Sequence, residues 1–368
     1  MTAQRALMPD YLRLFALFGI VAVNAPYMAF SLDSGFFAAP SYTVVDEVVM
    51  GLVHGLFMGK SYGLFSFMFG VGLAFMMRSA ETCSLPFARI YWARMVGLLA
   101  LGIAHGCLFF PYDILALYAM TGAAFFFLRN LSARTLTILG GLLVLVQIPM
   151  TTAILLSYGK PGLPGAYEIQ VMTTGTWAEV VALRTETFSF ISFGALFYQG
   201  FSSLGWFCLG LAALRIGAID DNDHQLWRRL RFLLAPALAV SLSGGALMVR
   251  GDYTWGVVLT LHAAPFATAA YLGVIARVSR PPGPGMQLLL KAGASSLTVY
   301  LGQSIILSTV FAPYGLGLWS QLSPGIVTAL AFAVTLALIA FVILWTRVFR
   351  LGPFEWLLRK ITYAGVSR

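Results

Sequence analysis

Apolar blocks long enough to cross a lipid bilayer follow one another along almost the whole chain, from Leu12 to Thr346. A membrane-spanning helix needs about 20 mostly apolar residues. Ten blocks approach that length: 13–31, 61–77, 95–110, 114–128, 135–157, 194–214, 232–249, 255–276, 292–312 and 325–346. Only 10% of the residues are charged, against about 25% in a soluble domain. The sequence therefore predicts one all-α membrane domain over 1–368, a bundle of about ten transmembrane helices.

The positions of lysine and arginine predict that both termini lie in the cytoplasm. If ten spans alternate from a cytoplasmic N-terminus, 19 of the 23 basic residues fall inside, and Lys60, Lys160, Arg184 and Arg250 fall outside. Basic residues concentrate on the cytoplasmic side of membrane proteins. We read the net charge of +9 as a topology signal and expect no nucleic-acid partner. The expected location is a bacterial cytoplasmic (inner) membrane.

Two five-span halves, 1–157 and 194–352, are expected on either side of an outer loop at 158–193. That loop mixes Gly and Pro with charged residues and could form a lid or a partial helix. Residues 41–59 are less apolar than a span and predict an amphipathic helix on the outer surface. Residues 353–363 place aromatic and basic side chains together, which is typical of a helix in the inner interface.

His105 is the most informative of the few polar residues inside the apolar blocks. Its side chain could bond a neighbouring carbonyl, or it could serve as a general base or acid, because histidine titrates near neutral pH. Asp113 could orient the ring if Pro111 turns the chain back. The alternative role of Asp113 is to cap the hairpin.

Asn24, His262 and Gln303 are further polar residues within the apolar blocks. Asn24, His105 and His262 fall at similar depths and could surround one cavity in the outer half of the membrane. Amide side chains often join helices by hydrogen bonds, and they can also stabilise an oxyanion. For His262 a structural role is favoured. The three cysteines have no zinc-like spacing, so no metal is expected.

Several short motifs occur along the chain in an order that resembles a known protein family. The motifs are 5–13 with Ala16, Gly19 and Asn24, then 59–60, 64–72, 102–105, 113–115 with 118–119 and Gly122, 296–304, and 352–356 with 362–363. Together they resemble the YeiB-like family, also called domain of unknown function 418, over nearly the whole chain. Two departures stand out: Tyr112 replaces a frequent Gly, and 292–294 (Ala-Gly-Ala) lack a frequent Arg, which could remove a charge contact or move it to Lys291.

The YeiB-like family is similar in plan to transmembrane acyltransferases, which include acyltransferase family three and the lysosomal heparan glucosaminide acetyltransferases. This resemblance implies that an acyl group passes from cytosolic acyl-CoA to an acceptor across the membrane, with an intramembrane histidine taking part. Acyltransferase family three carries that histidine at the end of the first span, where this chain has Asn24. His105 would have to take its place.

The resulting hypothesis gives each candidate residue a role. His105 is the general base, Asp113 orients it, and Asn24 or Gln303 supports the oxyanion, while His262 belongs to the substrate site. Four arginines are candidates to hold the phosphates of acyl-CoA, because guanidinium groups match phosphate geometry; they are Arg13, Arg78, Arg89 and Arg94. The general concentration of basic residues on the cytoplasmic side would also explain these four arginines.

The expected partners are membrane lipids, acyl-CoA as a co-substrate, an envelope sugar, lipid or metabolite as the acceptor, and a second copy of the chain in a homodimer. No tightly bound cofactor is expected. Two alternatives stay open: a transporter or exporter of a small molecule, and a non-catalytic membrane protein.

Overall fold

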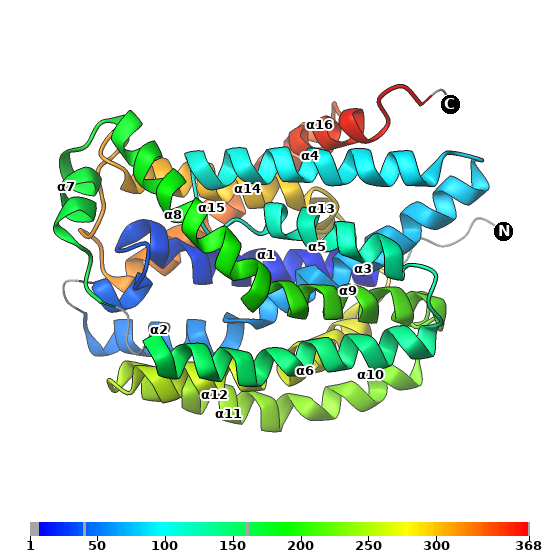
Figure 1. Cartoon of the computed structure of the whole chain (residues 1–368), viewed down its shortest axis with the longest axis horizontal. Coiled ribbons are helices and arrows are strands. Elements are labelled where there is room, and N and C mark those ends of the chain that lie inside the picture. The colour runs from blue at the N-terminus through cyan, green and yellow to red at the C-terminus, as the bar shows by residue number, and fades with distance from the viewer. Residues whose placement is uncertain (1–6, 40–41, 159–161, 367–368) are drawn as a thin grey trace.

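The computed structural model describes residues 7–39, 42–158 and 162–366, and these residues form a helical bundle without strands (Figure 1). This confirms the all-α prediction. The α-helices are α1 (Met8–Ala29), α2 (Val44–Phe57), α3 (Lys60–Thr82), α4 (Phe87–Leu108), α5 (Ile114–Leu128), α6 (Ala133–Tyr158), α7 (Ala166–Thr174), α8 (Trp177–Tyr198), α9 (Gly200–Arg215), α10 (Gln225–Leu230), α11 (Leu234–Val249), α12 (Tyr253–Val278), α13 (Pro284–Ala294), α14 (Ser296–Phe311), α15 (Pro324–Trp345) and α16 (Pro353–Thr362). Short 3₁₀ helices occupy Gly35–Ala38 and Arg231–Leu233. Arg5, Lys160 and Arg368 lie outside the described residues.

Eight segments among the described residues are long and apolar enough to cross a membrane, or nine if the bent pair α13 and α14 counts as one span. The chain is therefore a multi-pass membrane protein. This agrees with the prediction of about ten spans, although the set differs: α8 is a candidate span that the sequence did not indicate. Two predicted spans, α5 with 15 residues and α9 with 16, are shorter than the usual span.

Helix α2 corrects the prediction of an amphipathic helix on the outer surface. It packs against α1, α11 and α15 and joins α3 through a break at Met58 and Gly59, where Gly59 adopts a positive φ of 76°. Its polar residue Asp46 is buried because the carboxylate caps two helices. It accepts from Thr43 at the start of α2 and from Gly325 N at the start of α15.

Helix α8 corrects the prediction of an outer loop over 158–193. It begins at Trp177, where Thr176 and Glu179 form a capping box, and it runs on to the break before α9. Its basic residue Arg184 is buried, and the guanidinium donates to Leu108 O at 2.7 Å and to Tyr314 Oη at 2.9 Å. Helix α8 is therefore a candidate membrane span, although its sequence contains charged residues.

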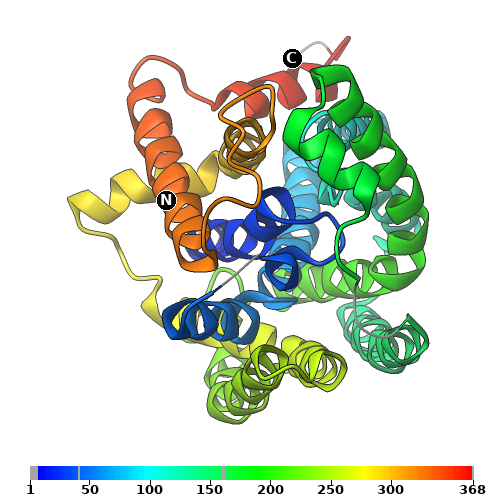
Figure 2. The ribbon, with the colours of Figure 1, turned by 90° about the vertical axis from the view of Figure 1, so that its left-hand side faces the viewer.

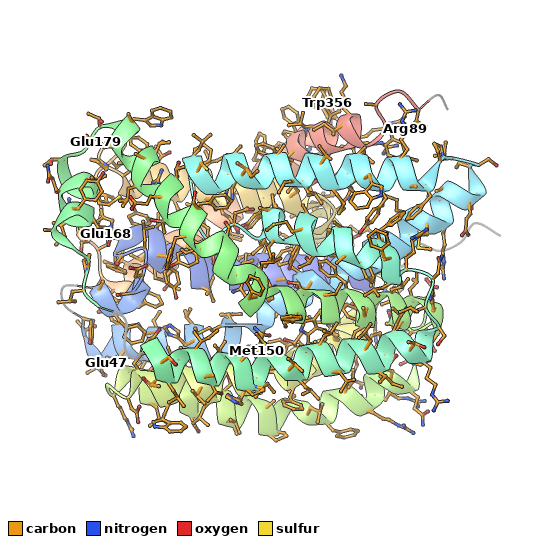
Figure 3. The ribbon with its side chains drawn as sticks, in the orientation of Figure 1. Glu47, Arg89, Met150, Glu168, Glu179 and Trp356 are labelled. Carbon is orange, nitrogen blue, oxygen red and sulfur yellow. The ribbon has the colours of Figure 1, made fainter. Side chains whose placement is uncertain are left out.

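Helix α1 lies at the centre of the bundle, and α6 lies at its edge (Figure 2). We call the end that holds the α3–α4 and α5–α6 turns the basic end, since Arg89 and Arg129 lie there. Figure 3 shows Arg89 at this end, whereas Glu168 and Glu179 lie at the opposite end. Helix α16 packs on α4 near the basic end, which confirms that the predicted tail segment is helical.

Lys60 corrects one detail of the predicted charge distribution. Its side chain is 0% exposed and lies inside the bundle at the start of α3, not on the outer surface. The ammonium group donates to Ser241 Oγ and to the α2 carbonyl His54 O at 3.4 Å. A cation beside the carbonyl end of a helix is favourably placed. With Lys60 and Arg184 both buried, Arg250 is the remaining exposed basic residue of the four expected outside, within the described ranges.

Candidate functional site

His105 lies in the last turn of α4, directly before a tight reversal of the chain. Helix α4 ends at Leu108, and the amides of Phe109 and Phe110 both donate to His105 O, at 2.9 and 3.0 Å. The chain then turns back, and α5 begins after Asp113. The eight residues from His105 to Asp113 would span roughly 12 Å in a straight helix. The reversal brings the two side chains together instead.

Asp113 performs two tasks with its two carboxylate oxygens. Oδ1 accepts from Ala116 N at 2.9 Å, which caps the N-terminus of α5. Oδ2 lies 2.7 Å from Nδ1 of His105, and both side chains are buried. The predicted contact between His105 and Asp113 is therefore confirmed, and so is the capping role that was its alternative.

The contact with Asp113 determines where the proton of His105 sits. A carboxylate is an acceptor only, so Nδ1 must carry the hydrogen. In a neutral imidazole the other nitrogen is then a free acceptor. His105 Nε2 is buried and has no hydrogen-bond partner within the described residues. The arrangement supplies an oriented base whose lone pair has no partner among the described residues but is enclosed within the protein.

Tyr300 on α14 forms a cluster with His105 and Asp113. The sequence did not indicate Tyr300 as a site residue. Its hydroxyl donates to Asp113 Oδ2 at 3.3 Å and accepts from Ile114 N at 3.4 Å. Its ring centre lies 5.3 Å from that of His105. The only available signal was that Tyr300 stands one helical turn before Gln303 in a motif already singled out.

Gly102 allows α4 and α5 to approach closely at this point. A Cβ atom at this position would lie 2.6 Å from Asp113 Oδ1 and even closer to Ala116 N. Gly106, one turn further along α4, is packed as closely, since a Cβ there would lie 2.3 Å from the Phe188 ring of α8.

The substitution Gly102→Ala is expected to destabilise the protein by about 1–3 kcal/mol, because overpacking forces the two helices apart. Thermal unfolding in detergent measures the effect. The matched control is Gly141→Ala on α6, where a Cβ meets no atom within 4 Å. Equal unfolding temperatures for the two variants would contradict the close approach.

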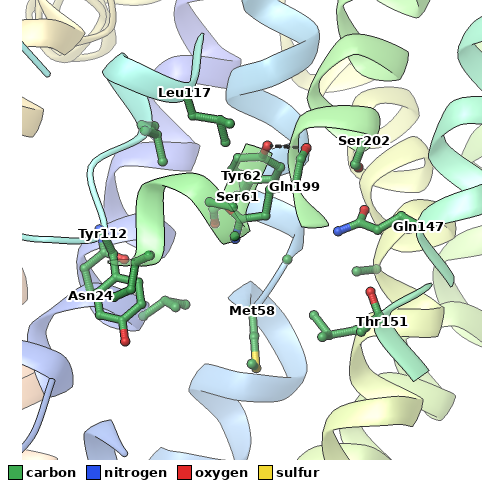
Figure 4. A pocket seen from close by; sticks show the side chains of 18 of the residues that line it. Asn24, Met58, Ser61, Tyr62, Tyr112, Leu117, Gln147, Thr151, Gln199 and Ser202 are labelled. Carbon is green, nitrogen blue, oxygen red and sulfur yellow. Dashed lines mark hydrogen bonds between the residues drawn. The ribbon is translucent and has the colours of Figure 1, made fainter. Parts of the chain in front are cut away.

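A cavity of about 900 Å³ lies next to this cluster, and we call it the large cavity. Figure 4 shows part of its lining, with Asn24, Tyr62 and Gln147 from three different helices. Asp113 and Ile114 form part of the same wall. Tyr62 Oη donates to Gln199 O at 3.0 Å, which ties α3 to the break between α8 and α9 (Figure 4).

A second cavity of about 150 Å³ lies on the other side of the cluster, and we call it the small cavity. Arg13 and Arg94 contribute to its wall, together with Ser296 at the start of α14. Tyr300 and Ile114 line it as well. At about 30 Å³ per water, it would hold about five water molecules.

Ile114 therefore separates the two cavities, because it lines both of them. Asp113 faces the large cavity and Tyr300 faces the small one. His105 lines neither, and its side chain is 3% exposed. The expectation that Asn24, His105 and His262 share one cavity is right for Asn24 and His262 and wrong for His105. The hairpin turn withdraws the ring behind Asp113.

The four candidate arginines fall into two pairs. Arg13 and Arg94 line the small cavity, and Arg13 also pairs with Asp10 at 3.3 Å. Arg78 and Arg89 are exposed and line neither cavity. Arg78 lies 3.5 Å from Asp220 at the surface.

The remaining candidates are already engaged in hydrogen bonds. Gln303 lies away from both cavities, and its amide donates to Leu17 O at 3.2 Å and to Thr335 Oγ1 at 2.9 Å. It therefore joins α14 to α1 and α15. His262 lines the large cavity, but its nitrogens lie 2.5 Å from Val258 O and 3.1 Å from Thr152 Oγ1. Both residues have the geometry of structural links.

Comparison with known proteins shows what the chain is similar to. Residues 213–365 match the profile described as protein of unknown function (DUF418). The chain is 28% identical to "Uncharacterized protein YxaH" of Bacillus subtilis (strain 168), over 99% of this chain and 95% of that protein. It is also 28% identical to "Uncharacterized protein YeiB" of Escherichia coli (strain K12), over 96% of this chain and 95% of that protein. No solved structure matches. The family profile over 213–365 and the similarity of nearly the whole chain to these two proteins both agree with the resemblance to the YeiB-like family.

Proposed function

We propose that this protein is an integral membrane acyltransferase that transfers an acyl group from acyl-CoA to a hydroxyl-bearing acceptor, with His105 as the general base. The observation that carries the proposal is the position of the His105–Asp113 pair. Asp113 lines the large cavity, which has a mostly apolar lining, and its partner Tyr300 lines the small cavity, which has two arginines in its wall.

The reaction uses the free Nε2 of His105. The acceptor oxygen attacks the thioester carbonyl while Nε2 takes the hydroxyl proton, so that a carbon–oxygen bond forms. The tetrahedral intermediate then breaks its carbon–sulfur bond, and the leaving thiolate receives the proton from the imidazolium. Asp113 steadies that imidazolium through Nδ1, as a carboxylate does in a catalytic triad. The products are the acylated acceptor and free CoA.

The proposal places the narrow pantetheine arm of acyl-CoA in the small cavity. At about 150 Å³, the volume of about five water molecules, this cavity must widen to hold the arm. The nucleotide stays outside at the basic end. The proposal requires Ile114, which lines both cavities, or Tyr300, which lines the small cavity and contacts His105, to move when substrates bind. Arg13 and Arg94 in the wall of the small cavity contact the phosphates of acyl-CoA.

Arg13→Gln and Arg94→Gln are expected to raise the KM for acyl-CoA by roughly tenfold, with a smaller change in kcat. A lost charge-assisted hydrogen bond costs about 1.5–3 kcal/mol. The matched controls are Arg78→Gln and Arg89→Gln, which remove equal charge from the same end outside the cavity. If all four variants raise the KM equally, general electrostatic attraction explains the effect and the small cavity is not the donor site.

A transporter is the alternative function, and the volume of the large cavity favours it. The two proposals are separated by vesicles that contain the purified protein and acyl-CoA, in which thiol release and efflux of a candidate acceptor are measured together. An acyltransferase releases thiol and loses this release in His105→Ala. A transporter moves the acceptor with no thiol release.

A further inference from the structure

The large cavity opens sideways through the wall of the bundle, between α6 and α8. Its lining includes Phe190 and Phe197 of α8, which are 82% and 52% exposed. Ile154 of α6 is also exposed and lines it. Both helices are candidate membrane spans. An opening between two apolar spans with exposed aromatic rings at its rim faces lipid chains.

The segment around Leu32, at the end of the bundle away from the basic end, is held by hydrogen bonds and apolar packing. The Leu32 peptide is held from two sides, since its N–H donates to Glu168 Oε1 at 2.8 Å and its carbonyl accepts from Tyr112 Oη at 2.6 Å. A separate apolar core above it consists of Leu32, Val171, Met172, Val180, Leu183 and Trp319. No residue from 162–176 lines the cavity.

The lining of the large cavity is mostly apolar, and Asp113 is its one acidic residue among the described residues. No lysine, arginine or glutamate lines it among the described residues. Both oxygens of Asp113 are already used. A phosphate or ammonium group would lose its hydration there without gaining a counter-charge, which costs several kcal/mol.

One polar atom of the lining has no partner. The hydroxyl of Ser61 is 2% exposed and makes no hydrogen bond within the described residues, although the side chain lines the cavity. Figure 4 labels Ser61 beside Tyr62 among the lining residues. Its oxygen lies against Gly19 of α1, where an added Cβ would come within 2.0 Å of it. A buried hydroxyl without a partner is costly, and a hydroxyl of a bound molecule would satisfy it once the Ser61 side chain turns toward the cavity.

We infer that the large cavity binds an uncharged, hydroxyl-bearing membrane lipid that enters sideways between α6 and α8. Its hydroxyl lies toward Ser61 and Asp113, and its hydrocarbon chain extends past Phe190 and Phe197 into the bilayer. The volume of about 900 Å³ is at the upper end of the usual range for ligand sites. The assignment of this lipid as the acyl acceptor rests on the proposed function, whereas its binding does not.

The test uses two photoactivatable probes with the same long hydrocarbon chain and a diazirine. One ends in a hydroxyl and the other in a phosphate. The protein in phosphatidylcholine nanodiscs is irradiated with each probe, and the labelled peptides are identified. We expect the alcohol to label α6 and α8 near the opening. The phosphate probe is expected to label at least about tenfold less, because burial of an unpaired charge costs several kcal/mol.

Gly194→Trp provides the variant that blocks the opening. Gly194 lines the cavity, and a Cβ there meets no atom within 4 Å, so the ring can be added without a clash at the helix backbone. The matched control is Gly141→Trp, which has equally open space on α6 and does not line the cavity. Labelling should be lost in Gly194→Trp and kept in Gly141→Trp.

Three results would overturn the inference: no labelling near the opening, equal labelling by both probes, or labelling that persists in Gly194→Trp. The labelling result does not depend on whether the protein catalyses acyl transfer. If His105→Ala binds the alcohol normally and no longer transfers acyl groups, both proposals stand. If His105→Ala transfers acyl groups normally, the acyltransferase mechanism fails and the binding result keeps its meaning.

Discussion

Replacement of His105 by alanine is expected to lower the rate of acyl transfer by about 10²–10⁴-fold, which is the usual contribution of a general base. The physical reason is the loss of Nε2, the one buried ring nitrogen near the two cavities that has no partner among the described residues. The measurement is release of free CoA thiol from acyl-CoA by purified protein in nanodiscs with the acceptor present.

The control for this variant is His224→Ala. His224 caps α10 on the loop after α9 and lines neither cavity. His224→Ala should keep the rate of thiol release within about twofold of the wild-type rate. The lost helix cap costs about 1 kcal/mol of stability, and the substitution changes no group at the site. Wild-type rates in His105→Ala would refute the role of the imidazole.

The substitution Asp113→Asn is expected to lower the rate by about 10–100-fold, the usual cost of losing a group that orients a functional histidine. The carboxylate uses one oxygen for Ala116 N and the other for His105 Nδ1. An asparagine has only one oxygen, so it cannot accept both hydrogen bonds. Either the cap of α5 or the orientation of the imidazole is lost.

Asp252→Asn is the matched control for Asp113→Asn. Asp252 caps α12 by accepting from Trp255 N at 3.3 Å, and it has no histidine partner. Asparagine caps helices about as well as aspartate, so this variant should keep both stability and rate. If Asp113→Asn also keeps the rate, Asp113 is only a helix cap.

Local features of the site could be predicted from the sequence. The pairing of His105 with Asp113 depends on a chain reversal between them, and Pro111 marks that reversal. The helical class and the long apolar blocks followed from composition and block length. These predictions rest on residues close together in the chain, so no knowledge of packing between distant helices was needed.

Features that depend on distant contacts could not be predicted. Arg184 and Glu179 made α8 read as a loop, but Arg184 reaches Leu108 O and Tyr314 across the bundle. Lys60 looked like an outer charge until Ser241 and the end of α2 provided its partners. Tyr300 joins the site from a helix 187 residues further along the chain than Asp113. Each partner is known only once the helices are placed.

The most direct test of the account is a structure of the protein with a non-hydrolysable thioether analogue of acyl-CoA. The account predicts the pantetheine arm in the small cavity, the nucleotide phosphates near Arg13 and Arg94, and the acyl carbon within reach of His105 Nε2 after Tyr300 or Ile114 has moved. An analogue bound elsewhere, with the ring still enclosed behind Asp113 and Tyr300, would contradict it.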